Sequence, residues 1–275
     1  MRILSIAGSD SGGGAGIQAD IKTVTALGGY AMTAITAVTV QDSNGVHGVH
    51  PVPPQIVAEQ IRAVMADIGA DAIKTGMLVS GPCVDAVADA LEAFSAVPLV
   101  VDTVMIAKGG ASLLDDGGIH AMKTRLFPRA ALITPNAPEA ARLAGITVES
   151  ADDLARAGMM LREMGARAVL VKGGHLAGET VSDVLVDEAG VHRFSGSRIE
   201  SSSTHGTGCT LASAIAMGLG QGLSLQEAIL RARAFVRHAM RTGLSLGRGT
   251  GPLNHLHGIG LNSPSPREGG GKEHE

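Results

Sequence analysis

The chain has 275 residues, a formal net charge of −4 and only two cysteines. This length suffices for one large α/β domain with a sizeable core. The charge argues against a basic surface for nucleic acid, and no stretch reaches the roughly 18 unbroken apolar residues that a membrane span needs. Cys83 and Cys209 are far apart in the sequence, so no disulfide framework is expected. We therefore expect a reducing, cytoplasmic location.

Strand-like and helix-like segments alternate along the chain. Helical spacing or helix-start signals mark several segments, and Ser80 is expected to cap one of them. The predicted strands, in chain order, are 2–8, 31–41, 70–78, 98–105, 130–136 and 166–174, followed by a hairpin over 180–196 with its turn near 188–190. The predicted helices are 16–29, 53–69, 80–94, one starting near 137, 207–220 and 224–242.

This alternation predicts an α/β fold with a mainly parallel central sheet and helices on both faces. The late hairpin should add antiparallel strands to one edge of that sheet. No internal repeat or linker is visible, so residues 1–262 are expected to form a single domain. Residues 263–275 have no apolar anchor and are expected to be a disordered tail.

Polar residues gather where the predicted strands end. Ligands of open α/β sheets bind outside the carboxyl ends of the strands. An ordinary polar loop is the better explanation of any one of these positions, but together they predict a polar, phosphorylated ligand. The positions are 8–10, 41–42, 74–76, 102–103, 136 and 172–174.

The first of these strand ends runs into a glycine-rich loop, GSDSGGGAGIQAD, at residues 8–20. Its backbone amides and the following helix N-terminus could hold an anion or approach a polar ligand closely. The loop fits only the looser, alanine-ended form of the dinucleotide fingerprint and has no P-loop lysine. A mobile turn is the alternative, but Asp10 and Asp20 flank the loop and favour a ligand role.

Two further strand ends carry groups suited to a phosphorylated ligand. Asn136 and Glu139 stand three residues apart at a helix start, where they could hold hydrated Mg²⁺ or simply cap the helix. Lys172, beside two glycines, could neutralise a phosphate or extend its ammonium to water.

The stretch STHGTGCT at residues 203–210 places Cys209 at a glycine-rich turn that opens a helix. Unpaired amides at such a turn stabilise charge on a transferring phosphoryl group. The helix N-terminus should lower the pKa of the Cys209 thiol, so that it could accept a proton. If Cys209 were a nucleophile with His205 as its base, no residue is visible as the third member of a catalytic triad. A metal site would need further ligands near Cys209, and none is visible. A packing role as a small buried residue stays open.

Seven motifs occur in the order found in hydroxymethylpyrimidine/phosphomethylpyrimidine kinases of the ribokinase-like superfamily, which the chain resembles from residue 2 to about 258. They are AGSDSGGGAGIQADIKT, ITAVTVQDSNGV, KTGML, VVDTVM, LITPNAPEA, VKGGH and THGTGCTLASAIA. Cysteine in the HGTGCT motif, where most of the superfamily has aspartate, narrows the resemblance to pyrimidine kinases and a branch of pyridoxal kinases.

The resemblance implies a pyrimidine pocket near the first loop. Gln41 matches the residue that hydrogen-bonds the aminopyrimidine, since its amide both donates and accepts. Further pocket contacts are implied at Gly8, Ala15, Asp20 and Met77. The sequence departs from the family pattern at Gly12, Val40 and Thr75, which bears on substrate preference and not on the reaction class.

The resemblance also implies the catalytic and nucleotide groups. Cys209 matches the catalytic base, and Lys172 matches a phosphate contact. Asn136 and Glu139 match a motif tied to Mg·ATP, and Asp102 matches a residue of the metal's water network, so Glu139 and Asp102 would reach Mg²⁺ through water. The anion hole is implied at Gly206, Thr207 and Gly208.

The implied function is ATP-dependent phosphorylation of 4-amino-5-hydroxymethyl-2-methylpyrimidine, then of its monophosphate, in thiamine diphosphate biosynthesis. ATP and Mg²⁺ would be the cofactors, and a homodimer is expected from the resemblance. The alternatives are a pyridoxal kinase of the same fold and a non-catalytic pyrimidine-binding protein. A cysteine-dependent hydrolase has no supporting motif.

Overall fold

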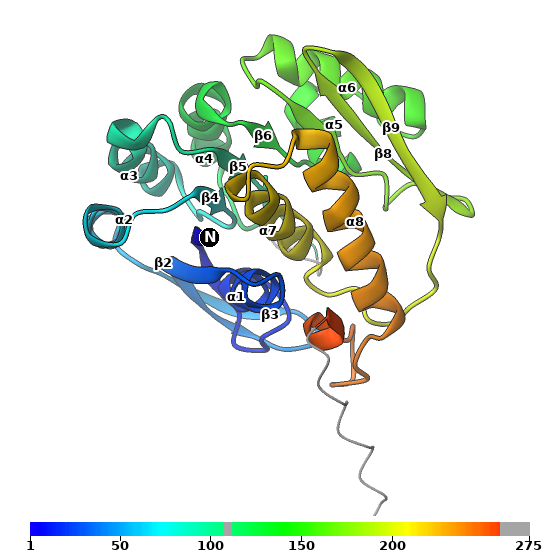
Figure 1. Cartoon of the computed structure of the whole chain (residues 1–275), viewed down its shortest axis with the longest axis horizontal. Helices are drawn as coiled ribbons and strands as arrows, with labels where there is room; N and C mark the ends of the chain where they lie inside the picture. Colours follow the sequence, from blue (N-terminus) through cyan, green and yellow to red (C-terminus); the bar gives the residue numbers. More distant parts are fainter. Residues whose placement is uncertain (107–109, 111, 259–275) are drawn as a thin grey trace, which may run out of the picture.

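The computed structural model describes residues 1–106, 110 and 112–258 (Figure 1). The tail predicted to be disordered, residues 263–275, lies outside the described residues. None of the described helices combines the length and the apolar character that crossing a membrane requires.

The strands of the described chain form one nine-stranded sheet, in the order β3-β2-β1-β4-β5-β6-β7-β8-β9. The six central strands, β2, β1, β4, β5, β6 and β7, run parallel to one another. Their bounds are β1 Arg2–Ser9, β2 Tyr30–Gln41, β3 Val46–Pro51, β4 Ala72–Thr75, β5 Leu99–Val101, β6 Leu132–Ile133, β7 Val169–Val171, β8 Thr180–Asp187 and β9 Gly190–Ser197.

Antiparallel strands close both edges of the sheet. β8 and β9 form the predicted hairpin beside β7, and the predicted ribokinase-like arrangement of a mainly parallel sheet is confirmed. At the other edge β3 runs antiparallel to β2, which the sequence analysis did not predict. The segment 46–51 contains no continuous apolar run or clean alternation, because as an edge strand it buries little side chain.

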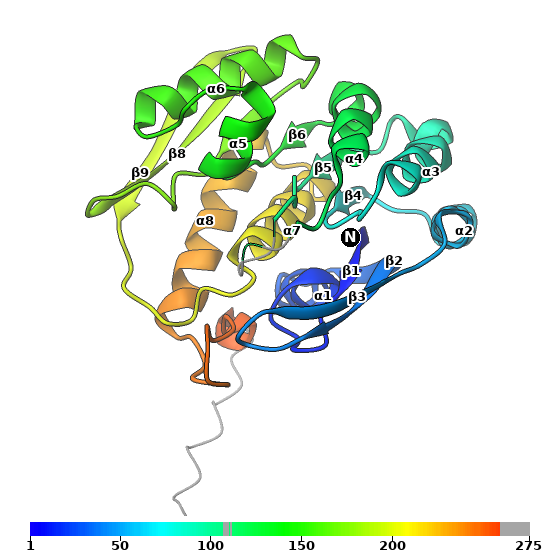
Figure 2. The ribbon, with the colours of Figure 1, turned by 180° about the vertical axis from the view of Figure 1, so that it is seen from behind.

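Helices cover both faces of the sheet, as Figures 1 and 2 show from opposite sides. One core cluster packs under α1, α7 and α8, and the other under α2 to α6. The bounds are α1 Gly16–Ala26, α2 Pro54–Asp67, α3 Gly81–Leu91, α4 Asp116–Ala121, α5 Ala137–Ala144, α6 Ala151–Glu163, α7 Thr207–Gly220 and α8 Leu225–Arg241.

The central strands divide their side chains between the two cores by simple alternation. In β4, Ile73 belongs to the core under α2 to α6, while Ala72 belongs to the core under α1, α7 and α8. Lys74, two residues after Ala72, therefore points toward α1 and α7. A lysine in this buried position is unusual.

Local capping explains several helix starts. Asn136 and Glu139 form a capping box on α5, and Ser150 and Asp153 form one on α6, a helix that the sequence analysis did not predict. Ser80 is the N-cap residue of α3 as predicted, but its side chain makes no capping hydrogen bond. Pro82 in the first turn supplies a helical φ instead.

The buried centre of the sheet should dominate the free energy of unfolding. We expect Ile73→Ala, at a fully buried site in β4, to lower it by about 2–5 kcal/mol. The matched control is Ile56→Ala on α2, where the side chain is 46% exposed and the change should be below about 1 kcal/mol. Urea denaturation measures both, and equal losses would contradict this assignment of the core.

Candidate functional site

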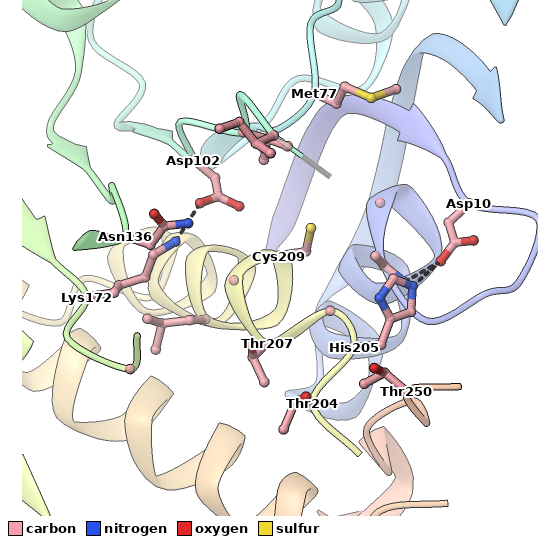
Figure 3. Close-up of a pocket in the computed structure, with 18 of the residues that line it drawn as sticks. Asp10, Met77, Asp102, Asn136, Lys172, Thr204, His205, Thr207, Cys209 and Thr250 are labelled. Atoms are coloured by element: carbon pink, nitrogen blue, oxygen red, sulfur yellow. Dashed lines mark hydrogen bonds and ion pairs between the residues drawn. The ribbon is translucent and has the colours of Figure 1, made fainter. Parts of the chain in front are cut away.

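A cavity of about 900 Å³ lies at the carboxyl ends of the parallel strands, beside the N-terminus of α7 (Figure 3). The structure brings almost every predicted site residue into its lining. These residues are Gly8, Ala15, Gln41, Met77, Asp102, Asn136, Glu139, Lys172, Gly206, Thr207, Gly208 and Cys209. Asp20 is the exception.

The glycine-rich loop after β1 is folded around the carboxylate of Asp10. This carboxylate accepts hydrogen bonds from the backbone amides of Gly12, Gly14 and Ala15 at 2.7–3.0 Å. These three amides are therefore committed to a protein carboxylate. The expectation that they hold a ligand's anion is wrong.

His205 ties this loop to the start of α7, and it is a pocket residue that the sequence analysis considered only as a partner for a nucleophile. Its Nε2 lies 3.0 Å from Asp10 Oδ2 and 3.2 Å from Gln41 Nε2. Thr39 donates to Gln41 Oε1 at 3.2 Å. Because His205 Nε2 donates to Asp10, it does not also accept from the Gln41 amide. Thr39 is therefore the group that holds this amide as it faces the cavity.

Asp10 is ionised more readily than an ordinary aspartate. Burial raises the pKa of Asp10, but hydrogen bonds from His205 and from the amides of Ala15 and Gly12 outweigh burial and hold the pKa below its usual value. The carboxylate form therefore stabilises this corner of the cavity.

Gly206 sets the start of α7. Its φ of +85° lies in the left-handed region, and a Cβ there would collide with the carbonyl oxygen of Gly14. The N-terminal turn of α7 consequently packs directly on the first loop. This contact presents the amides of Thr207 and Gly208, in the first turn of the helix, on the side of the cavity.

Cys209 lines the cavity one residue further along, but its acidity is opposite to the prediction. Burial raises the pKa of the thiol to about 11, although the nearby ammonium of Lys74 and the amide of Gly16 lower it. The carboxylates of Asp20 and Asp102 add to the rise. Cys209 is only half-buried, and the sequence could not show that burial and two carboxylates from distant segments would outweigh the helix N-terminus.

Asp20 was expected at the wall of the pyrimidine pocket, and the structure corrects this. Asp20 is fully buried, and its carboxylate binds Lys74 Nζ through both oxygens at 2.9 Å. The hydroxyls of Ser5 and Ser213 donate to the same carboxylate at 2.5 and 2.7 Å. Its acceptor positions are filled by protein groups, so Asp20 does not reach the cavity.

Lys172 and Asp102 form a second buried ion pair, and this one lines the cavity. Lys172 Nζ lies 3.0 Å from Asp102 Oδ1, which also accepts a hydrogen bond from Thr134. Opposite charges hold the pKa of each partner in the ionised direction despite burial. A Cβ on Gly208 would stand 3.3 Å from Lys172 Nζ, so the pair abuts the N-terminal turn of α7.

Asn136 and Glu139 meet as a capping box at the cavity edge. Asn136 Oδ1 accepts from the Glu139 amide, and Glu139 Oε2 accepts from the Asn136 amide, both at 2.9 Å. Thr103 donates to the same Oε2 at 3.0 Å. Burial raises the pKa of Glu139, with Lys172 opposing the rise. The two residues therefore do cap α5, and both also line the cavity.

The far end of the cavity holds cationic residues that no motif singled out. Arg233 on α8 forms an ion pair with Asp183 on β8, and Asp183 also accepts from the Gly173 amide at 2.9 Å. Arg198 and Arg237 line the same end. Arg198 follows β9, whereas Arg233 and Arg237 lie on α8. These segments are distant in the sequence, so residue spacing gave no signal.

Comparison with known proteins identifies the family. The sequence model of the family described as phosphomethylpyrimidine kinase matches residues 10–254. The chain belongs to this family. It is 46% identical to a hydroxymethylpyrimidine/phosphomethylpyrimidine kinase of Streptomyces coelicolor, covering 94% of this chain and 95% of that protein. It is 53% identical to a thiamine biosynthesis bifunctional protein of Geobacter sulfurreducens, covering 92% of this chain but only 52% of that protein.

Solved structures of similar fold include pyridoxal kinases and a phosphomethylpyrimidine kinase. A Staphylococcus aureus pyridoxal kinase in complex with ADP has a TM-score of 0.86 and 36% identity, covering 93% of each chain. A phosphomethylpyrimidine kinase from Clostridium difficile has a TM-score of 0.77 and 39% identity, covering 87% of this chain and 99% of that one.

The hydrogen bonds of Asp10 should make the first loop sensitive to pH. Because the folded state lowers the pKa of Asp10, its contribution to stability is present above the unfolded pKa of about 3.9 and is lost as pH falls through the lower, folded value. We expect Asp10→Asn to lower Tm near neutral pH, with the difference from wild type narrowing below about pH 4. Calorimetry across this range measures it, and a difference independent of pH would contradict the assignment.

Proposed function

We propose that this chain phosphorylates 4-amino-5-hydroxymethyl-2-methylpyrimidine with ATP, and then phosphorylates the resulting monophosphate to the diphosphate, for thiamine diphosphate biosynthesis. The observation that carries the proposal is the placement of Cys209. It stands at the N-terminus of α7, beside the Lys172–Asp102 pair, in one cavity with Gln41. Membership of the phosphomethylpyrimidine kinase family supports the same reaction.

The pyrimidine would occupy the part of the cavity between the first loop and Met77. Gly8 permits close approach there, because a Cβ on Gly8 would collide with the Met77 side chain. Ala15 adds a small wall. The amide of Gln41 would pair with a ring nitrogen and the exocyclic amine, since it offers both a donor and an acceptor.

The phosphates of ATP would lie across Lys172 and the N-terminal turn of α7. The amides of Gly206, Thr207 and Gly208 supply dipoles that favour negative charge, and Lys172 supplies a full positive charge. These groups would hold the transferring phosphoryl group in line with the hydroxymethyl oxygen, which is the main task in such a reaction.

Asp102 and Glu139 fit a hydrated Mg²⁺. Within the described residues, the hydrogen bonds to Asp102 go to Oδ1 and those to Glu139 go to Oε2. The other oxygen of each carboxylate, Asp102 Oδ2 and Glu139 Oε1, accepts none of them. No group of three His, Cys, Asp or Glu side chains gathers in that part of the chain. One or two carboxylates with phosphate and water are the usual setting for Mg²⁺, which would neutralise phosphate charge here.

Cys209 would take the proton of the hydroxymethyl group. Its raised pKa means that the thiol is protonated near neutral pH, so the sulfur must first release its own proton. A base with a pKa above the assay range gives a rate that rises with pH. The charged neighbours of Cys209 therefore help to set the fraction of the protein in which Cys209 is a thiolate.

The test is a comparison of acceptors with purified protein, Mg²⁺ and ATP. We expect kcat/KM for hydroxymethylpyrimidine and for its monophosphate to exceed that for pyridoxal by at least tenfold. Cys209→Ala should lower kcat for hydroxymethylpyrimidine by roughly 10²–10⁴, the usual contribution of a general base. Mass spectrometry of the products and an ADP-coupled assay measure both quantities.

Pyridoxal kinase is the second candidate, because pyridoxal kinases of the same fold match this structure closely. A higher kcat/KM for pyridoxal would favour it over the pyrimidine reaction. Near wild-type kcat in both Cys209→Ala and Cys209→Ser would exclude Cys209 as the base. Binding of the pyrimidine without ADP formation would indicate a binding protein.

Glu139 offers a sharp test of the metal site. Gln is as good as Glu in a capping box, so Glu139→Gln should keep α5 and its Tm while removing one negative charge. We expect the Mg²⁺ concentration for half-maximal rate to rise about tenfold, corresponding to roughly 1.4 kcal/mol. An unchanged Mg²⁺ requirement with unchanged Tm would remove Glu139 from the metal site.

The family resemblance further supports a cytoplasmic homodimer. Both cysteines are free thiols, consistent with a reducing compartment. Val38 and Val40, two residues apart on β2, are 50% and 65% exposed near the edge of the sheet, and a second copy could cover them. Sedimentation equilibrium measures the oligomeric state.

A further inference from the structure

Lys74 and Asp20 form a fully buried ion pair for which the proposed function has no role. Both side chains are inaccessible to solvent, and Lys74 Nζ lies 2.9 Å from each carboxylate oxygen of Asp20. Ser5 and Ser213 donate to the two oxygens of Asp20 and complete its hydrogen bonds. The pair joins β4 and α1, while the two serines extend the network to β1 and α7.

Stability alone does not account for this pair. Taking two charges out of water costs several kcal/mol per ion, and well-packed apolar residues of similar volume are often as stable or more so. The neighbouring position Ala72 on the same face of β4 is apolar, as a core strand requires. A buried charge pair next to a ligand cavity is therefore a candidate for a role in chemistry.

The network reaches the helix turn that bears Cys209. Ser213 follows Cys209 by four residues on α7, so the two side chains share one face of the helix. The Ser213 hydroxyl donates to Asp20, which in turn holds Lys74. Gly76 leaves space around this ammonium, because a Cβ there would stand only 3.0 Å from Lys74 Nζ. The ammonium is thus fixed beneath the catalytic turn and away from the ligand.

Four charged groups from four separate segments of the chain interact electrostatically with the Cys209 thiol. Lys74 on β4 and Lys172 after β7 favour a thiolate, while Asp20 on α1 and Asp102 after β5 oppose it. Burial has the largest effect on the pKa of Cys209 and raises it, and Lys74 has the next largest effect and lowers it. Both lysines are paired with an aspartate, Lys172 with Asp102 and Lys74 with Asp20. Lys172 would also face the phosphates of ATP, whereas Lys74 is buried away from the cavity and would contact no ligand.

We propose that Lys74, held in place by Asp20, is a positioning residue for the kinase reaction whose fixed ammonium stabilises the thiolate of Cys209. The inference rests on the proposed function. Cys209 first loses its proton to solvent. The thiolate then takes the proton of the hydroxymethyl group as the oxygen bonds to the γ-phosphorus and the bond from phosphorus to the ADP oxygen breaks.

Hydroxymethylpyrimidine and its monophosphate should depend on the Lys74-stabilised thiolate to different extents. The hydroxymethyl group carries a proton that must be removed. A phosphate monoester has its second pKa near 6, so its attacking oxygen is already ionised at neutral pH. Lys74 and Cys209 should therefore assist the alcohol acceptor far more than the phosphate acceptor.

The experiment uses Asp20→Asn combined with Lys74→Met, which removes both charges and leaves no unpaired buried ion. Lys74 lowers the pKa of Cys209 more than Asp20 raises it, so loss of both charges should still raise that pKa. We expect the ratio of kcat for hydroxymethylpyrimidine to kcat for its monophosphate to fall by about threefold or more near pH 7.5, since about half a unit of pKa changes the thiolate fraction about threefold. The rise of the alcohol rate with pH should move to higher pH by about half a unit or more.

A double-mutant cycle shows whether the pair acts through Cys209. In a Cys209→Ala background the same two substitutions should lower the alcohol rate no further. An equal fall for both acceptors, or no fall for either, would overturn the proposal. If the protein with these substitutions does not fold, Asp20→Leu with Lys74→Met gives the apolar version. Wild-type protein that phosphorylates neither acceptor would instead contradict the proposed function.

Discussion

The site depends on one close contact, the packing of Gly206 against the carbonyl of Gly14. This contact seats the N-terminus of α7 on the loop that follows β1. A side chain at Gly206 would separate the two segments. With them joined, the helix amides, the pyrimidine-facing Gln41 and the strand-end residues Asp102 and Lys172 face one cavity. A parallel sheet supplies the polar strand ends at one edge, and this contact places the anion hole beside them.

Charge compensation is the second organising feature. Asp10 is matched by His205 and three amides, Asp102 by Lys172, and Asp20 by Lys74. These pairings favour the charged forms of Asp10, Asp102 and Lys74, whose pKa values burial alone would move in the neutral direction. The three pairs differ in access to the cavity, since Asp20 and Lys74 are sealed from it while Lys172 lines it. Ligand charge can therefore alter the second pair, whereas the third provides a constant field.

The environment of Cys209 explains why a helix N-terminus is an incomplete predictor of thiol acidity. Partial charges of the helix favour the thiolate. Partial burial of the sulfur and two nearby carboxylates act in the opposite direction and prevail. In the proposed reaction this arrangement limits the thiolate population, which is the quantity that neighbouring cations adjust.

The sequence by itself determined the alternation of strands and helices, the parallel sheet and the strand-end residues, because these follow from local periodicity and chain order. Glycine and cysteine in STHGTGCT likewise located the turn before α7. Tertiary structure decided the rest. The edge strand β3 has no periodic signal, the burial of Asp20 depends on Lys74 and Ser213 from distant segments, and the acidity of Cys209 depends on four elements at once. Such long-range distances and desolvation exist only after folding, so residue spacing does not encode them.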